Sequence, residues 1–430
     1  MSFTPLTVST SSDGSLLTNY GITEPSEGPW RFRRLAEPEL TSELERFANA
    51  KSSVISGARV DSVWFQPAQG EENQSQDRVY AGRCSFGGQT WSLFGVFDGH
   101  AGEECADYTL KYFPDHLEAA LSARMPEDMS SALSNAFTSF DNQILDGVKT
   151  IFPNPQALVS MSNEGLTSQI NDQASGGVNY EKILLAMRGT TALVALLDEA
   201  HKNMWVAGAG DCRAILGVQR PDGKWEARDL IAPHNGSNPH ELENVASAHP
   251  GEPEVTLKNR VLGAIAVTRA FGDAAFKLPA EYTWEVFLRA NPGFRVHSSV
   301  EAFTKRNLTP PYMTASPDVV HLDLGGDGST SDGTPRFIIL TSDGSVDEHV
   351  LNIFGRSEAQ SFQKWVELVG AQLDAKFGDE IGMENKTSNL ALSILREAFG
   401  GSNEELVSMF LTLDMKDKWI DDTSIQVIVL

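Results

Sequence analysis

Residues 93–102 read Leu-Phe-Gly-Val-Phe-Asp-Gly-His-Ala-Gly, an apolar run that ends abruptly in a carboxylate, a glycine and an imidazole. Residues 91–97 have the length and the β-branched and aromatic content of a buried strand. Asp98 follows directly, and it needs partners or a metal because burying an unpaired charge is costly. Gly99 lets the backbone turn sharply, which brings its carbonyl close to whatever Asp98 holds. The alternative is an ordinary strand-to-helix turn that Asp98 caps.

The same plan occurs twice more toward the C-terminus. Residues 336–344 are an apolar strand that ends in Asp343 and Gly344, and residues 421–430 begin with Asp421 before another apolar strand. Three strand-edge carboxylates so far apart in the sequence converge only through a sheet. Because no His or Cys joins them, an all-oxygen site for a hard divalent cation such as Mg²⁺ or Mn²⁺ is favoured over zinc or copper.

Two further carboxylates stand beside predicted strands. Asp77 ends a polar loop, residues 69–77. It either faces Asp98 from a neighbouring strand or is a solvated loop residue. Asp211 interrupts the apolar stretch 203–217, which places it at a bulge, in an ion pair with Arg213 or facing a polar site. Three histidines nearby lack the tight spacing of a metal site, so we predict surface and helix-cap positions for them: His234, His240 and His249.

Composition excludes several classes of protein. The net charge of −24 and the pI near 4.7 argue against partners such as nucleic acid and anionic membranes, which require basic patches. Three scattered cysteines without CxxC spacing indicate neither a disulfide framework nor a zinc knuckle, and a reducing compartment is the simplest interpretation. No apolar run approaches the ~18 residues of a membrane span.

The presence or absence of apolar periodicity along the chain indicates its domain organisation. We predict an N-terminal arm and helix over residues 1–50 and one catalytic domain over residues 51–430. Two aperiodic stretches, near residues 150–182 and 274–312, are predicted to be insertions, the first a loop and the second an insertion or a lid. Helical spacing predicts helices near residues 101–121 and 128–148.

Six short motifs stand in an order that resembles the type 2C metal-dependent serine/threonine protein phosphatases (the PPM family). They are Phe97-Asp-Gly-His-Ala-Gly102, Gly189-Thr-Thr-Ala192, Gly210-Asp-Cys-Arg-Ala214, Thr268-Arg-Ala-Phe-Gly-Asp273, Thr341-Ser-Asp-Gly344 and Asp421-Asp-Thr-Ser424. The match runs from about residue 59 to residue 430. Segments around His234 and Pro310-Pro311 look most like the branch that contains pyruvate dehydrogenase phosphatase.

The resemblance implies an α+β fold, an αββα sandwich of two antiparallel sheets flanked by helices, with a dinuclear metal site at one edge. Carried over by motif, Asp98 bridges two Mg²⁺ or Mn²⁺ ions, the Gly99 carbonyl binds one, and Asp343 and Asp421 complete the ligands. Asp77 acts through metal-bound water. Two more carboxylates resemble those of a third, weaker metal site: Asp211 and Asp347. Arg269 and Asp273 belong to a motif interpreted as structural.

The chemistry that the resemblance implies is hydrolysis of phosphoserine and phosphothreonine in protein substrates. A water held between two cations becomes hydroxide near neutral pH and attacks the phosphorus directly, so no covalent phosphoenzyme is needed. His100 then protonates the departing oxygen as a general acid. The other role for His100 is a hydrogen bond that fixes the loop.

The sequence departs from the family pattern at three places. Gln76 stands where the family commonly has Glu. No Arg is present at the usual phosphate-clamping place, where Asn73 is the candidate to bind the substrate phosphate. Ser345-Val346 replaces the usual Leu-Trp pair, which is a packing element.

Two hypotheses about the molecule's role remain. The first is an active phosphatase. The second is a catalytically silent relative that keeps the fold as a scaffold or regulatory binding protein. Retention of four converging carboxylates favours the enzyme, because their mutual repulsion destabilises the fold without cations. We further expect a monomer, in the cytoplasm or alternatively in the mitochondrial matrix.

Overall fold

The computed structural model describes residues 6–20, 28–68, 74–122, 128–295, 299–324, 334–378 and 389–430. They form two compact units. Unit 1 comprises Met1–Val79, Ala214–Leu230 and Leu324–Leu430, and unit 2 comprises Tyr80–Arg213 and Ile231–Asp323. Each unit has its own hydrophobic core of buried apolar side chains.

Unit 2 is built on a five-stranded sheet in the order β17-β11-β10-β7-β6. The pairs β7–β10, β10–β11 and β11–β17 are antiparallel. The strands are β6 Arg78–Phe86, β7 Gln89–Phe97, β10 Ala192–Asp198, β11 Asn203–Ala209 and β17 Asp318–Asp323. The run from Trp91 to Phe97 is buried throughout, which confirms the strand predicted from its apolar sequence.

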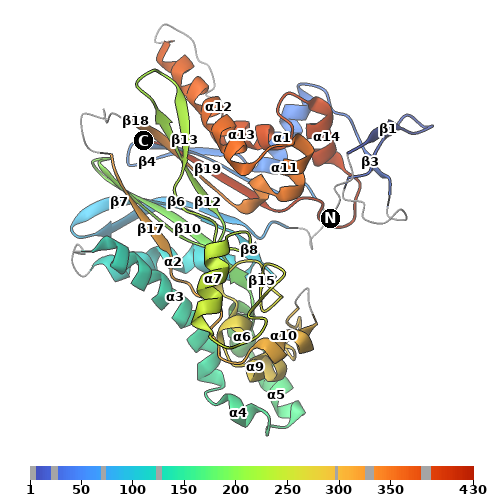
Figure 1. The fold of residues 1–430 in the computed structure, drawn as a ribbon, viewed down its shortest axis with the longest axis vertical. Helices are drawn as coiled ribbons and strands as arrows, with labels where there is room; N and C mark the ends of the chain where they lie inside the picture. The colour runs from blue at the N-terminus through green and yellow to red at the C-terminus, as the bar shows by residue number, and fades with distance from the viewer. Residues whose placement is uncertain are drawn as a thin grey trace. The chain divides into compact units, whose positions relative to one another are not determined.

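Two long helices, α2 (Glu104–Ser122) and α3 (Met129–Ile151), lie along this sheet (Figure 1). The Asp128 side chain caps α3 by accepting a hydrogen bond from the Ser131 backbone N–H. The apolar residues that predicted α3 are buried in the core of unit 2: Leu133, Phe137, Phe140 and Ile144. Both helices were therefore predicted correctly from helical periodicity.

Unit 1 contains a six-stranded sheet in the order β13-β12-β18-β19-β5-β4. The strands are β4 Lys51–Ile55, β5 Ala58–Phe65, β12 Arg213–Gln219, β13 Trp225–Asp229, β18 Thr334–Thr341 and β19 Thr423–Val429. Helices α12 (Glu358–Gly378) and α13 (Leu390–Ala398) pack on this sheet (Figure 1). The other helical segments of unit 1 are α1 Glu39–Ala48, η4 Asp343–Val346, α11 Glu348–Phe354 and α14 Glu404–Thr412.

The predicted α+β class is confirmed, because each unit combines helices with antiparallel strand pairs. Face-to-face packing of the two sheets as a sandwich stays a prediction, as does the boundary near residue 50. The apolar stretch 203–217 is two strands rather than one, since β11 and β12 belong to different sheets and Asp211 lies between them.

Three segments have more regular structure than their sequences predict. The N-terminal arm contains a three-stranded antiparallel sheet made of β1 Val8–Thr10, β2 Leu16–Thr18 and β3 Trp30–Phe32. Residues 152–180 are not a loop, because they contain α4 Pro155–Leu158, α5 Asn163–Ile170, η2 Gln173–Ser175 and the start of α6 Val178–Met187. Residues 274–312 contain α8 Ala274–Lys277, α9 Ala280–Tyr282, η3 Thr283–Phe287 and α10 Val300–Arg306. These elements are mostly too short for a periodic pattern to reveal them.

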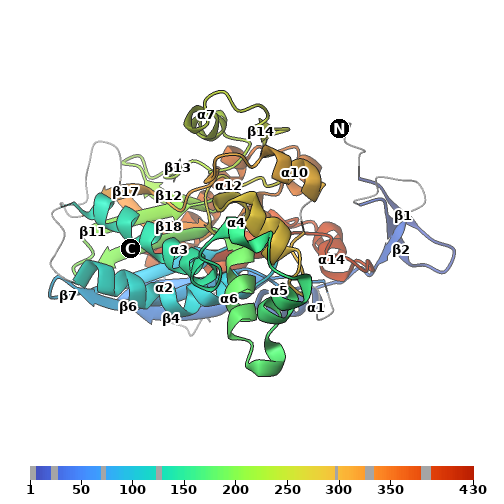
Figure 2. The ribbon, with the colours of Figure 1, turned by 90° about the horizontal axis from the view of Figure 1, so that it is seen from below.

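The remaining elements of unit 2 are short. They are β8 Gly99–His100, β9 Gly189–Thr190, α7 Pro239–Ala248, β14 Thr256–Leu257, β15 Arg260–Val261 and β16 Phe271–Gly272. Helix α7 and strand β14 lie together at the top of Figure 2. Among the described residues, no helix combines the length and the apolar character that crossing a membrane would require.

Candidate metal centre

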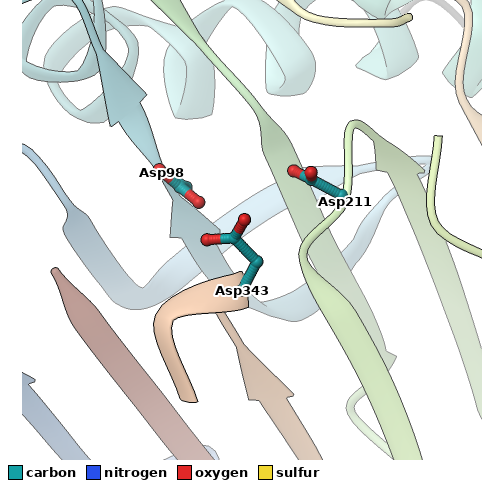
Figure 3. A group of neighbouring side chains, drawn as sticks. All are labelled: Asp98, Asp211 and Asp343. Atoms are coloured by element: carbon teal, nitrogen blue, oxygen red, sulfur yellow. The ribbon is translucent and has the colours of Figure 1, made fainter. Parts of the chain in front are cut away.

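In unit 2, two carboxylates lie at one edge of the five-stranded sheet. Strand β7 ends where β10 begins, as the pairing of Val96 with Leu193 shows, and β11 ends at the same edge. Asp98 directly follows β7, and Asp211 follows β11. The two side chains point toward one another, with carboxylate oxygens within 4.8 Å (Figure 3). The sheet therefore brings together two residues that lie far apart in the sequence.

The backbone at Asp98 is held by a neighbouring threonine pair. The Asp98 carbonyl accepts hydrogen bonds from the Thr191 N–H at 2.9 Å and from the Thr190 hydroxyl at 3.0 Å. These contacts explain why the motif Gly189-Thr-Thr-Ala192 accompanies the opening stretch. They fix the turn that presents Asp98 and Gly99.

Asp211 is buried, and its surroundings were only partly predictable. Asn235 donates a side-chain hydrogen bond to Asp211 at 2.8 Å. Burial raises the pKa of the Asp211 carboxyl above its usual value. Of the three options that the sequence left open for Asp211, the polar site is therefore the one that this contact supports.

Of the three histidines predicted at surface and helix-cap positions, His240 is exposed in the first turn of α7 as predicted, and the other two differ. His234 and His249 are buried rather than on the surface, although His249 is the C-terminal cap of α7. His234 lies 3.1 Å from the Asp318 carboxylate, and His249 contacts the Thr309 hydroxyl at 3.0 Å. These two partners come from residues 309–318, which the local sequence could not reveal.

In unit 1, a second group of carboxylates lies at one edge of the six-stranded sheet. Thr341 at the end of β18 pairs with Ile425 near the start of β19. Asp343 therefore follows β18 at the same edge at which Asp421 precedes β19. Asp77 reaches this edge too, because its Oδ2 accepts a hydrogen bond of 2.7 Å from the Ser342 hydroxyl. The predicted loop alternative for Asp77 is wrong, since this carboxyl is completely buried.

The carboxyls of this second group are electrostatically strained. Burial and the nearby Asp422 charge raise the pKa of Asp77 to about 7. Burial, with contributions from Asp422 and Asp347, raises the pKa of Asp421 to about 6. The Oδ1 atom of Asp77 is buried without a hydrogen-bond partner among the described residues. An orphaned, buried carboxylate oxygen fits a cation or a cation-bound water.

Asp422 is a member of this site that the sequence did not single out. Its carboxylate accepts hydrogen bonds from the Gln76 backbone N–H at 2.8 Å and from Gln66 at 2.8 Å. Lys418 pairs with Asp422 at 2.8 Å. Asp422 therefore fixes the backbone next to Asp77.

His100 is bound by a residue that was interpreted as structural. The His100 Nε2 atom lies 2.8 Å from a carboxylate oxygen of Asp273, which is buried. Burial alone lowers the pKa of His100, but the charge and the hydrogen bond of Asp273, together with the Asp211 charge, outweigh it, so the net pKa of His100 lies above its usual value. Arg269, from the same motif, forms ion pairs with Glu241 at 2.7 Å and with Asp318 at 2.8 Å.

Asp347, another predicted site residue, is a helix cap. Asp347 caps α11 by accepting hydrogen bonds from the His349 and Val350 backbone N–H groups. That contact accounts for one carboxylate oxygen, and a third-metal role for Asp347 stays a prediction. Asn73 lies outside the described residues.

The donors in both units suit hard cations. Every predicted ligand offers oxygen, and neither group contains a cysteine or histidine ligand. Mg²⁺ and Mn²⁺ prefer carboxylate, carbonyl and water oxygens. The residues present therefore fit the metal that the sequence predicts.

Comparisons with known proteins find a matching family model and several similar proteins. A family model described as Protein phosphatase 2C matches residues 66–347. A protein phosphatase 2C homolog of Schizosaccharomyces pombe is 28% identical over 373 residues, which cover 79% of this chain and 73% of the relative. The mitochondrial [pyruvate dehydrogenase [acetyl-transferring]]-phosphatase 2 of Homo sapiens is 27% identical over 394 residues, which cover 78% and 72%. The crystal structure of serine-threonine phosphatase 2C from Toxoplasma gondii aligns over 88% of this chain and 98% of that chain, with a TM-score of 0.47 and 15% identity.

Proposed function

The chain belongs to the protein phosphatase 2C family, and we propose that its acidic residues hold the metal ions with which it dephosphorylates proteins. It is a metal-dependent protein serine/threonine phosphatase. The observation that carries this conclusion is the family match over residues 66–347, a stretch that includes Asp98, His100 and Asp343. The comparisons give no support to the alternative of a catalytically silent scaffold.

The proposed ligand set follows the sequence prediction. Asp98, the Gly99 carbonyl, Asp343 and Asp421 would hold two cations, and Asp77 would act through metal-bound water. The orphaned Oδ1 atom of Asp77 supports its part in this set. Asp211 and Asp347 are the candidates for a third cation. The proximity of Asp211 to Asp98 supports the first of these.

The bound cations supply charge neutralisation for the phosphoryl group and an activated water. The protein's own residues supply position and a proton. Asp77 and Asp421 carry the negative charge that draws cations to this edge, at the cost of mutual repulsion when no cation is bound. His100 donates a proton to the departing serine or threonine oxygen. Because Nε2 contacts Asp273, that proton has to come from the other ring nitrogen, Nδ1.

The proposed substrates are phosphoserine and phosphothreonine proteins. With Mn²⁺ present, we expect phosphate release from a phosphoserine or phosphothreonine peptide, measured by a phosphate-release assay. The metal-free protein and a phosphotyrosine peptide of the same sequence are the two controls, and both should give little release. Equal release with and without Mn²⁺ would show that the metal centre is assigned wrongly.

Replacing His100 tests whether it is the general acid. Protonation matters most when the leaving oxygen is a poor leaving group such as a serine alkoxide, and hardly at all for a nitrophenolate. We expect His100→Ala to lose about 10²–10⁴-fold more activity on a phosphoserine peptide than on an aryl phosphate. The measurement is kcat/KM on both substrates. If both substrates slow equally while metal affinity falls, His100 only holds the loop that presents Asp98.

We also propose a cellular compartment for this chain. The likeness to a mitochondrial phosphatase of Homo sapiens supports the mitochondrial matrix, rather than the cytoplasm, as the proposed compartment of this chain. The monomeric state stays a prediction.

A further inference from the structure

A small antiparallel sheet connects three of the family motifs in unit 2. Its strand order is β16-β9-β8. His100 of β8 pairs with Gly189 of β9, and Gly189 pairs in turn with Gly272 of β16. Asp273 directly follows β16. The sheet therefore sets the Asp273 carboxylate beside the His100 ring, although the two residues lie 173 positions apart.

Gly189 leaves the space in which these two side chains meet. A Cβ atom at position 189 would overlap the His100 Nε2 atom and the Asp273 Oδ2 atom. No residue but glycine fits there without displacing the hydrogen bond of 2.8 Å between the two side chains. The glycine in strand β9 thus leaves the room that this hydrogen bond requires.

The backbone of Asp273 is held in an unfavourable conformation. Its φ of 51° lies in the left-handed region, which costs energy for residues other than glycine and is tolerated best by Asn and Asp. Its N–H donates to the Arg188 carbonyl at 2.9 Å. Strain of this kind persists only where the surroundings enforce it, and it gathers at functional sites.

A buried ion pair binds the backbone next to Asp273. Lys277 lies 2.8 Å from Asp141 of α3, and both side chains are buried. Asp141 also accepts a hydrogen bond of 2.8 Å from the Gly272 N–H, and Lys277 donates one of 2.7 Å to the Ala270 carbonyl. Both side chains of the pair thereby bind the backbone just before Asp273.

We propose that Asp273 is a positioning residue that orients the His100 ring, so that His100 can deliver its proton to the leaving oxygen. This role rests on the proposed function, in which His100 is the general acid. The carboxylate holds Nε2 and thereby turns Nδ1 outward, as a carboxylate behind a catalytic imidazole does in other enzymes. The buried pair of Lys277 and Asp141 supports the strand that carries Asp273.

The test is Asp273→Asn, which keeps the shape of the side chain and suits the left-handed backbone. The readout is the ratio of kcat/KM on a phosphoserine peptide to kcat/KM on an aryl phosphate. We expect this ratio to fall by about tenfold or more, which is part of the 10²–10⁴-fold that general acid catalysis supplies. Melting curves and the affinity for Mn²⁺ should show that the variant is folded and binds metal.

The matched control is Asp198→Asn. Asp198 is also buried and hydrogen-bonded, but it caps the β10–β11 turn at the other end of β10. Its replacement can cost stability, and it should leave the substrate ratio unchanged. A fall of the ratio in this control as large as in Asp273→Asn would overturn the proposal.

A double variant separates this inference from the proposed function. If Asp273 acts through His100, Asp273→Asn should change the ratio no further in a His100→Ala background. An equal additional fall there would overturn the positioning role while leaving the general acid intact. Equal slowing of both substrates by Asp273→Asn alone would overturn it as well. A His100→Ala variant whose ratio is normal would overturn both the general acid and the positioning role.

Discussion

Chelation with EDTA is expected to abolish phosphatase turnover and to lower the thermal stability of the protein, and Mg²⁺ or Mn²⁺ should restore both. A cation that binds only the folded protein stabilises it by mass action, by about 2.7 kcal/mol at a free concentration of about 100 times Kd. The buried carboxyls Asp77 and Asp421 make the effect large, because a bound cation also removes the repulsion between them. Melting curves and a phosphopeptide assay, each with and without EDTA, measure the two effects.

The loss of stability should depend on pH in a defined direction. In the metal-free protein the pKa values of Asp77 and Asp421 are raised to about 7 and about 6. A raised pKa contributes stability that is present at low pH and is lost as the pH rises through the folded-state value. The stability gap between metal-loaded and chelated protein should therefore widen as the pH rises through about 6 and about 7. A gap that narrows over this range, or turnover that survives complete chelation, would contradict the two-metal centre.

The strand ends of the site could be predicted from the sequence, because the signal is local. An apolar run of strand length stops at Asp98 or at Asp343, and a third begins after Asp421. Sheet pairing then places the ends of neighbouring antiparallel strands at a common edge, which is how Asp98 comes close to Asp211. The six ordered motifs predicted membership of the type 2C phosphatase family, which the family model confirms.

The partners of these residues could not be predicted, because they come from distant parts of the chain. The sequence near Asp273 does not predict its contact with His100, and the sequence near Asp141 does not predict its ion pair with Lys277. The carboxylate beside His234 likewise comes from Asp318, far along the chain. The short strands β1 to β3 were missed for another reason, since three residues are too few for an alternating pattern to be recognised.

Asp98→Asn is expected to lose most of its turnover and part of its metal affinity, because the amide keeps the size of the side chain and removes its charge. The stabilisation that a metal ion gives to developing charge amounts to several kcal/mol. Losing about 3 kcal/mol of it lowers turnover by about 10²-fold. Steady-state kinetics at saturating Mn²⁺ and calorimetric titration with Mn²⁺ measure the two losses.

Asp128→Asn is a matched control for this variant. It makes the same chemical change at an exposed helix cap, where Asn and Asp are equally good and where the side chain accepts a hydrogen bond from the Ser131 N–H. Its turnover and metal stoichiometry should equal those of the parent protein. Asp98→Asn should also keep its fold, because Thr190 and Thr191 hold the Asp98 backbone through its carbonyl, which the substitution does not change. Full metal stoichiometry together with normal turnover in Asp98→Asn would show that another residue bridges the cations. In that case the proximity of Asp211 to Asp98 would make Asp211 the first alternative to test.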